Sequence, residues 1–442
     1  MDGQAKQPLV DRMVAATGGR RLVAESPGVG WLAIEVIPAF VWTQITGALS
    51  MEFFYFVSFL AALGVERTRM PALTMAVMAA GIGMGLLVLR RPASDPRRQC
   101  VVDTLVGRAL WLGTVLGPLA AWKIGLGPGW ILAIALVFVF SGQLVHVAGG
   151  SSFITWTQSV VPAARRGFFY GWRNISSYIV VALILLVVGR LLPRDAVQGA
   201  GVAPLASLLL GATLVGILGV WPLARAPAMP ASAQLAGYAP LLPQLRGNRP
   251  FLRFLAWSML INVALALSPA MQPELYRGAG VVEGAMATWQ AVVYYPAMLV
   301  GIVWTGWSLP RTGGRWQLVI AHSATLLGET ALLLLSRERL GWLMPLVLGC
   351  LGVARGMWSV AWVSRLQEII PRGDARFAAV AVASGATAGL VVSVAAVASG
   401  PWLERWLAGH GWPGLAWTLV AAGVAARLLA TPFLLRRDAP AR

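Results

Sequence analysis

The chain alternates between long apolar runs and short polar connections along nearly its whole length. A membrane-spanning helix needs about 20 mostly apolar residues, and each run meets that length. The first run is long enough to tilt or to begin in the headgroup layer. The pattern predicts twelve spanning helices, with approximate limits at residues 34–62, 70–89, 102–122, 128–150, 174–192, 202–223, 251–272, 285–307, 317–335, 341–363, 377–399 and 413–435.

The composition supports a membrane protein. Hydrophobic residues make up 58% of the 442 positions and charged residues 12%, and the mean hydropathy is +0.72. A soluble protein carries about a quarter charged residues. Cys100 and Cys350 are far apart, as are the histidines, so the sequence predicts no disulfide framework, no metal site and no cofactor. The polar N-terminal segment lacks the apolar core of a secretory signal and is predicted to be a cytoplasmic tail.

The basic residues indicate how the helices are oriented. The net charge of +18 would suggest nucleic acid as a partner of a soluble protein, but here the arginines lie between apolar runs. If the N-terminus is inside and the helices alternate, most basic residues fall in inside segments and few in the short outside loops. This bias follows the positive-inside rule and predicts that both termini are cytoplasmic, with the lipid bilayer and not nucleic acid as the surroundings.

The longest internal connection is rich in proline and alanine and divides the twelve runs into two sets of six. The predicted organisation is an N-terminal tail, a first bundle, a linker, a second bundle and a C-terminal tail. These parts comprise residues 1–30, 31–224, 225–250, 251–436 and 437–442.

A short basic loop occurs once in each half. The segments "VVPAARRGFF", from Val160, and "IIPRGDARFA", from Ile369, both follow the fourth helix of their half and precede the fifth. Proline ends a helix, the arginines stay in water beside anionic lipid, and the aromatic residue re-enters the membrane. The repeat at equivalent places indicates an internal duplication.

Six plus six helices, a central linker and a P-x-x-x-R-G-x-F loop after helix four resemble the major facilitator superfamily of secondary transporters. A second loop, "GWSLPRTGGR" from Gly306, is similar to that family's G-x-x-x-D-R-x-G-R-R motif. Pro310 stands where the family has aspartate, and Gly314 replaces one arginine. The equivalent first-half loop keeps Asp95 but not the glycine spacing. The matching basic residues of the two loop types, for which the resemblance implies gating or packing roles, are Arg165, Arg166, Arg311 and Arg315.

The resemblance implies an all-α polytopic membrane protein of two six-helix bundles related by pseudo-two-fold symmetry. It also implies a monomer in a bacterial inner membrane that moves a small molecule by alternating access, driven by an ion gradient such as protons. Helices one, four, seven and ten would line a central cavity, with substrate near the midplane.

Arg355 is the first candidate for substrate binding. It lies in the middle of helix ten, and Trp358 and Trp362 share its face. An arginine in a cavity can hold a carboxylate or phosphate by two hydrogen bonds. This favours an anionic or amphipathic substrate over a polycation. The alternative is a structural arginine paired with a carbonyl or carboxylate group.

Two further groups are candidates for proton coupling. Glu52 on helix one lies near Tyr55 and has Gln44 upstream on much the same side, and a desolvated carboxylate can carry a proton. The alternatives are a solvated position at the outer boundary or a pair with Arg355. His146, which shares a face of helix four with Gln143, can relay a proton, or it can be a polar residue between helices.

Other polar and small residues have weaker assignments. Asn262 on helix seven and Gln290 with Tyr294 on helix eight can bind substrate or join helices by hydrogen bonds. Glycines four apart allow close helix approach. The resemblance implies that helices two and eleven meet across the halves. Helix two carries the pair Gly81 and Gly85, and helix eleven carries the pair Gly385 and Gly389.

Two rival functions remain beside transport. A transporter-like protein without transport, acting as a sensor or assembly partner, fits the aspartate missing at Pro310. A polytopic membrane transferase needs acidic or histidine clusters in a sizeable loop, and none of the short outer loops carries one. The sequence therefore predicts a protein that is not an enzyme.

Overall fold

The computed structural model describes residues 9–47, 54–66, 69, 71–90, 95–162, 165–191, 201–228, 241–268, 271–281, 283–370 and 375–436. The secondary structure of these residues is helical, and no strand occurs among them. The helices of the first half are α1 (Leu9–Val14), the π-helix η1 (Ala15–Gly19), α2 (Arg20–Glu25), α3 (Val29–Ile34), α4 (Val36–Thr46), α5 (Phe54–Ala62), α6 (Pro71–Arg90), α7 (Pro96–Lys123), α8 (Pro128–Val160), α9 (Arg166–Leu191), α10 (Val202–Leu218) and α11 (Val220–Arg225).

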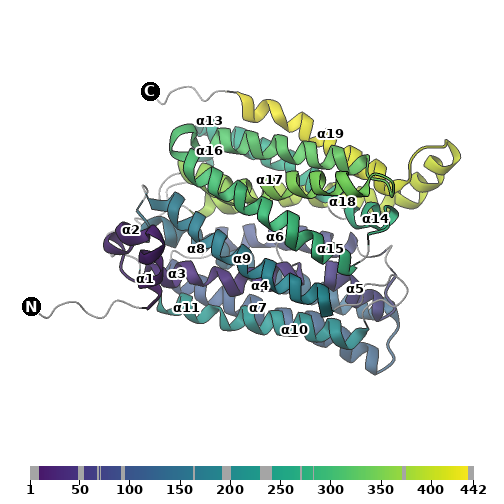
Figure 1. Cartoon of the computed structure of the whole chain (residues 1–442), viewed down its shortest axis with the longest axis horizontal. Helices are drawn as coiled ribbons and strands as arrows, with labels where there is room; N and C mark the ends of the chain where they lie inside the picture. Colours follow the sequence, from purple (N-terminus) through teal and green to yellow (C-terminus); the bar gives the residue numbers. More distant parts are fainter. Residues whose placement is uncertain are drawn as a thin grey trace, which may run out of the picture.

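The second half follows the short helix α12 (Leu241–Gly247) of the linker region. Its elements are α13 (Arg249–Leu267), α14 (Gln272–Gly278), α15 (Glu283–Trp289), the π-helix η5 (Gln290–Tyr294), α16 (Tyr295–Leu333), α17 (Leu340–Ile369), α18 (Ala375–Gly409) and α19 (Leu415–Leu435). Figure 1 shows the two halves as two layers, with the first half below, the second above and both chain ends at the left.

Ten helical segments of the described residues are long and apolar enough to cross a membrane, and the shorter segment Ala72–Gly85 is also apolar. The predicted ninth run, 317–335, lies almost entirely in the second part of α16. Many exposed large side chains on these helices are apolar, as expected where lipid replaces water around the protein. The chain is an integral, multi-pass membrane protein.

One predicted span is wrong. The first span is not one helix over 34–62: it begins at Val29, the helix starting at Val36 ends at Thr46, and a separate helix covers 54–62. Gly47 ends the earlier helix at φ 77°, a conformation that glycine adopts without strain. The predicted break between spans eight and nine is confirmed at Gly313, where the non-helical φ of 74° and ψ of 160° separate the two helical parts of α16 by a kink.

The N-terminal segment is structured from Leu9 onwards. α1, η1 and α2 fold against α3 and the start of α9, where Leu22 and Val23 are buried with Trp156 and Phe169. The apolar side chains of this amphipathic segment account for its packing. The packing is not evident in the sequence, because polar residues lie between the apolar ones.

The two halves make equivalent contacts at the repeated loops. Ser26, just before α3, donates from Oγ to the carbonyl oxygen of Val160 at 2.7 Å. Asn248, just before α13, donates from Nδ2 to the carbonyl oxygen of Ile369 at 2.6 Å. Val160 and Ile369 hold the same place in the two repeated loops, so the residue preceding the first span of each half is tied to the end of the fourth.

A second pair of contacts repeats between the halves. Arg97 at the start of α7 donates to the carbonyl oxygen of Ala224 at 2.6 Å, near the end of α11. Arg315 donates to the carbonyl oxygens of Leu434 and Leu435 at 2.7 and 2.6 Å, at the end of α19. In each half, an arginine near the beginning of the third span thus binds carbonyl groups that have no partner within the sixth.

The halves touch along two seams. α6 packs on α18, and α9 packs on α15, η5, α16 and α17. In the first seam a Cβ atom on Gly81 would lie 2.8 Å from Ala386 Cβ, and one on Gly85 would lie 2.5 Å from Ala383 Cβ. Gly389 lies against Met78 of α6. The glycines therefore permit the close approach of α6 and α18, and their role in a sliding movement stays a prediction.

Replacing Gly85 with leucine is expected to disfavour the arrangement in which α6 and α18 touch, by about 1–3 kcal/mol, because the added side chain overlaps Ala383. Distances between spin labels on the two helices, in a background lacking Cys100 and Cys350, should lengthen. Gly150→Leu on α8 is the control, since nothing lies within 4 Å of a Cβ there. An unchanged distance distribution for Gly85→Leu would contradict the prediction.

Candidate functional site

A buried carboxylate lies between two guanidinium groups inside the first bundle. Glu35, at the junction of α3 and α4, is 3% exposed. Its Oε1 accepts from Arg108 Nη2 of α7 at 2.5 Å, and its Oε2 accepts from Arg173 Nη2 of α9 at 2.8 Å. Arg108 also donates from Nη1 to the carbonyl oxygen of Gly216 of α10 at 2.6 Å. This charged centre, Glu35 with Arg108 and Arg173, joins four spans.

A glycine and two aromatic rings surround the guanidinium groups of the charged centre. A Cβ atom on Gly219 would lie 3.2 Å from Arg108 Nη1, so a larger residue would crowd the guanidinium group. Arg108 Cζ lies 5.4 Å from the centroid of the Trp42 ring, and Arg173 Cζ lies 4.4 Å from that of Phe153. The ring faces attract the cations and supply part of the stabilisation that water would otherwise give.

The centre holds two positive groups against one negative group. The Nε atoms of Arg108 and Arg173 are buried and have no hydrogen-bond partner in the described part of the chain. Ionisable groups inside a membrane are costly and commonly mark ion or substrate pathways. The two Nε–H groups can therefore donate to a further hydrogen-bond acceptor. The single carboxylate of Glu35 holds the two arginines together.

Two polar contacts cross between the halves beside the charged centre. Asn174 Nδ2 of α9 donates to Ser359 Oγ of α17 at 3.0 Å. The Tyr295 hydroxyl of α16 donates to Gln44 Oε1 of α4 at 2.9 Å. Because both hydrogen bonds join helices of opposite halves, relative movement of the halves at this level must break or stretch them.

Tyr178 connects these contacts to Arg355. Its ring lies 4.9 Å from the ring of Phe40 and 6.1 Å from that of Tyr295, measured between centroids. Its hydroxyl lies near Ser359 and Arg355 of α17. Arg355 is partly buried on α17. We call the six residues at this level the inter-half cluster: Gln44, Asn174, Tyr178, Tyr295, Arg355 and Ser359.

The helix α9 links the charged centre to the inter-half cluster. Arg173 binds Glu35 within the first bundle, and its neighbour Asn174 binds Ser359 of the other half. Tyr178 follows about one helical turn further along. A displacement of α9 that breaks one of these contacts will therefore strain the other.

Gln143 and His146 lie inside the first bundle. The His146 ring is 4.8 Å from the Trp42 ring between centroids, and the His146 backbone lies close to Gly107 of α7. Gln143 is 3% exposed, and its Oε1 has no hydrogen-bond partner within the described residues. The structure thus places His146 beside Trp42, the ring that Arg108 also contacts, and buries Gln143 one turn earlier on the same helix.

The predicted substrate-binding residues Asn262, Trp358 and Trp362 make separate contacts within the second half. Asn262 donates to the carbonyl oxygen of Ser258 at 2.8 Å, and its side chain lies against Gly385. Trp358 and Trp362 pack on Trp257 and Phe254 of α13, at centroid distances of 5.1 and 6.1 Å. These aromatic residues form a wall between α13 and α17.

Gln290 and Tyr294 lie in the π-helix η5, and the Tyr294 ring is edge-on to that of Tyr295 at 5.4 Å. A π-helical turn inside a span is a frequent mark of a functional position. Glu52, the predicted proton carrier, lies outside the described residues.

The predicted loop arginines mostly bind backbone or nearby acidic groups. Arg165 forms an ion pair with Glu25 at 3.3 Å, and Arg166 donates to the carbonyl oxygens of Gln158 and Val161. Arg311 donates to the carbonyl oxygen of Trp307 at 3.0 Å. In place of a network around the family's aspartate, Glu368 accepts from the backbone of Gly314 at 3.1 Å and pairs with Arg365 at 3.1 Å.

A second buried ion pair lies in the other half. Arg427 of α19 donates from Nε and Nη2 to Glu329 of α16 at 2.7 and 3.0 Å, and His322 binds the carbonyl oxygen of Arg427 at 2.9 Å. Each carboxylate oxygen of Glu329 therefore accepts one hydrogen bond from Arg427. This pair joins the ninth and twelfth spans and fits a structural role.

Glu35, Arg108 and Arg173 are not among the residues that the sequence predicts for the site. Glu35 and Arg108 each interrupt an apolar run, and opposite charges inside membrane spans are expected to pair. That signal was present, but it does not say which charges meet. Arg173 lies just before the predicted fifth span, 174–192, whereas the structure includes it in α9.

No protein-family model and no curated protein sequence matches the chain. Solved structures of transporters do match its fold. The proton:xylose symporter XylE, bound to 6-bromo-6-deoxy-D-glucose, aligns with a TM-score of 0.60 and 16% identity over 94% of this chain and 96% of XylE. The nucleoside transporter NupG aligns with a TM-score of 0.60 and 13% identity over 92% and 99% of the two chains.

A third match is a bacterial homologue of the iron transporter ferroportin, in an outward-facing state with soaked iron. It aligns with a TM-score of 0.56 and 14% identity over 91% of this chain and 98% of that one. These alignments extend over nearly the whole of each chain. The chain is a polytopic membrane protein with the major facilitator superfamily fold, as the sequence predicted.

Proposed function

We propose that the chain is a secondary active transporter that moves a small organic solute by alternating access, with proton coupling at Glu35. The observation that carries the proposal is the position of the charged centre. A buried carboxylate with two arginine partners lies next to hydrogen bonds that join the two halves, and α9 contributes to both. The fold and its transporter neighbours support the class of function.

The coupling step follows from the charges. A proton on Glu35 removes the negative charge that holds Arg108 and Arg173, which leaves two guanidinium groups facing each other in a buried site. Their repulsion favours a displacement of α9, and that displacement strains the hydrogen bond from Asn174 to Ser359. The titratable neighbours are Cys100 and His146, both of which lie within electrostatic range of the centre.

The inter-half cluster is the proposed substrate site. It offers hydroxyl and amide groups for hydrogen bonds and one cation, Arg355, which favours an anionic or amphipathic solute over a polycation. Aromatic rings of Tyr178 and Tyr295 provide apolar contact.

Both termini are proposed to be cytoplasmic, in a bacterial inner membrane. The protein is proposed to act as a monomer, with residues 31–224 and 251–436 as its two bundles.

A ligand screen tests the substrate site. The purified protein is heated with sugars, amino acids, organic acids, phosphate esters and amphiphilic drugs, and a ligand at ten times its dissociation constant should add roughly 1.4 kcal/mol of stability. Arg355→Ala is expected to abolish stabilisation by an anionic ligand, whereas Arg190→Ala, at the far end of α9, should leave it unchanged. Equal stabilisation of both variants would remove Arg355 from the site.

Flux into proteoliposomes tests the coupling. With the identified ligand, an inward proton gradient should drive accumulation in the parent protein. Glu35→Gln should abolish this accumulation and still exchange the ligand at equal concentrations, because the neutral side chain removes proton binding but not the route. Accumulation by Glu35→Gln at the parent level would contradict proton coupling at Glu35. Absence of any ligand and any flux would favour the alternative of a sensor or assembly protein.

A further inference from the structure

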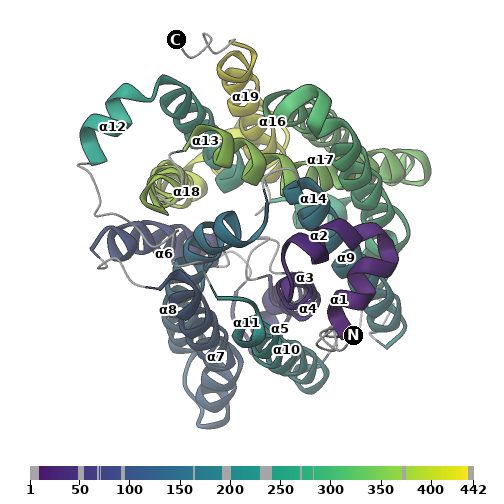
Figure 2. The ribbon, with the colours of Figure 1, turned by 90° about the vertical axis from the view of Figure 1, so that its left-hand side faces the viewer.

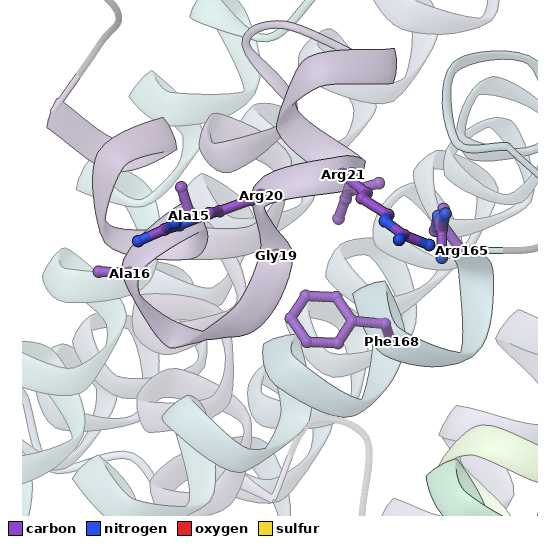
Figure 3. Close-up of a pocket in the computed structure, with 8 residues that line it drawn as sticks. Ala15, Ala16, Gly19, Arg20, Arg21, Arg165 and Phe168 are labelled. Carbon is purple, nitrogen blue, oxygen red and sulfur yellow. The ribbon is translucent and has the colours of Figure 1, made fainter.

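A pocket of about 500 Å³ lies between the N-terminal helices and the beginning of α9 (Figure 3). Arg20 and Arg21 of α2, Arg165, and Phe168 of α9 line it. Figure 2 shows α1 and α2 at the near end of the bundle, which is the end that carries both chain termini in Figure 1. The pocket thus belongs to the boundary between the bundle and the water.

The walls of the pocket are held in place from several sides. The carboxylate of Asp11 in α1 is fully buried and accepts from the backbone nitrogens of Gly28 and Gly30 at 2.7 and 2.9 Å. Trp172 of α9 donates from Nε1 to Thr17 Oγ1 at 2.6 Å. These contacts fasten the N-terminal helices to the transmembrane bundle, so the arginines of α2 are presented from a fixed backbone.

The pocket has an excess of positive charge. Of its three arginines, Arg165 pairs with Glu25 at 3.3 Å. Arg20 and Arg21 have neither an ion-pair nor a hydrogen-bond partner among the described residues. In Figure 3 the side chain of Arg21 extends toward Arg165, although like charges repel, and that of Arg20 extends to the other side, toward Ala16. An anion between Arg21 and Arg165 would remove that repulsion and provide acceptors for their N–H groups.

An exposed apolar face of α9 leads away from the pocket. Phe168, Ile179, Leu183 and Val187 are 37%, 45%, 59% and 57% exposed. Their spacing places them on much the same side of the helix. They belong to the membrane-spanning segment Arg166–Val188, so exposure of these side chains beyond the pocket means contact with lipid chains. Phe168 thus borders the positive pocket, and the exposed side chains of Ile179, Leu183 and Val187 follow further along the same helix.

We propose that this pocket binds the phosphate headgroup of an anionic phospholipid, with the acyl chains of that lipid along the exposed face of α9. The arginines supply the charge and the donors, and Phe168 marks the change from headgroup to chain. A soluble phosphate would use the arginines alone and leave the apolar face without a role. The site is separate from the charged centre and the inter-half cluster and does not depend on transport.

Lipid binding is measured by native mass spectrometry of the full chain, delipidated in neutral detergent. Dioleoyl phosphatidylglycerol is titrated against dioleoyl phosphatidylcholine, which has the same chains without net charge. One phosphatidylglycerol should be retained preferentially. The double variant Arg20→Gln, Arg21→Gln should bind it about 30-fold more weakly, since each arginine near an anionic lipid surface contributes about 1 kcal/mol.

The control carries the same change of charge elsewhere. Arg246→Gln with Arg249→Gln removes two exposed arginines of α12 and α13 and should leave phosphatidylglycerol binding unchanged. Equal weakening in both double variants would show a general surface-charge effect and overturn the site. Glycerol 3-phosphate and inorganic phosphate serve as soluble probes. If either displaces the lipid at comparable concentration, the site takes a free anion and the lipid proposal is wrong.

Discussion

Replacing Glu35 with alanine is expected to lower the unfolding free energy by roughly 3–5 kcal/mol, because it leaves buried arginines without their counter-charge. Arg108 is 2% exposed and would keep only its hydrogen bond to the carbonyl group of Gly216 and its contact with the Trp42 ring. Arg173 would keep only its contact with the ring of Phe153. Neither guanidinium group has water available at its buried face to replace the lost carboxylate.

Unfolding with SDS in mixed micelles measures the change in stability. Glu404→Ala removes an exposed carboxylate near the end of α18 and should change the unfolding free energy little. Adding Arg108→Met to Glu35→Ala should recover part of the loss, because the double variant no longer leaves Arg108 unpaired. A Glu35→Ala protein as stable as the parent would mean that the charged centre does not hold the four spans together.

Replacing Gly356 with valine is expected to destabilise the second half by about 3 kcal/mol through overpacking. A Cβ atom at Gly356 would lie 2.1 Å from the carbonyl oxygen of Met298, and one at Gly352 would lie 2.4 Å from that of Tyr294. The two helices must separate to admit either side chain. Since these glycines flank Arg355 on α17 and face α16, separation also moves Arg355 relative to Tyr295.

A position on the same helix provides the control for Gly356. Nothing lies within 4 Å of a Cβ atom at Gly349, so Gly349→Val should have little effect on the unfolding midpoint. If Gly356→Val unfolds at the same SDS fraction as Gly349→Val, the close approach of α16 and α17 is not what stabilises this half. Ligand binding, measured alongside, should fall in Gly356→Val if the inter-half cluster is the substrate site.

The sequence predicted the helices and their division into two halves because these depend on local patterns. Apolar runs of spanning length, arginine-rich connections and the repeated loop from Val160 and Ile369 are each visible within a short window. The structure shows what the repeated loop does at the backbone, since Val160 and Ile369 accept hydrogen bonds from Ser26 and Asn248. Those partners are distant in sequence and belong to no common motif.

The candidate site was much less predictable. Arg355 and Gln44 were selected as polar residues in the expected cavity helices, and the structure brings both to the contact between halves. His146, on the same predicted helix four as Gln143, contacts Trp42 and Gly107 of α7 within the first bundle. Helical spacing fixes which residues share a face, whereas the neighbour of that face depends on how all the helices pack together.

The sequence by itself determined that this is a helical membrane protein and predicted its two six-helix halves, because hydrophobicity and charge decide how each segment partitions between lipid and water. The tertiary structure alone decided that Glu35, Arg108 and Arg173 meet, and that Arg173 and Asn174 link this centre to the other half. A buried charge only requires a partner of opposite sign. Which partner it finds is set by the way helices far apart in sequence pack together.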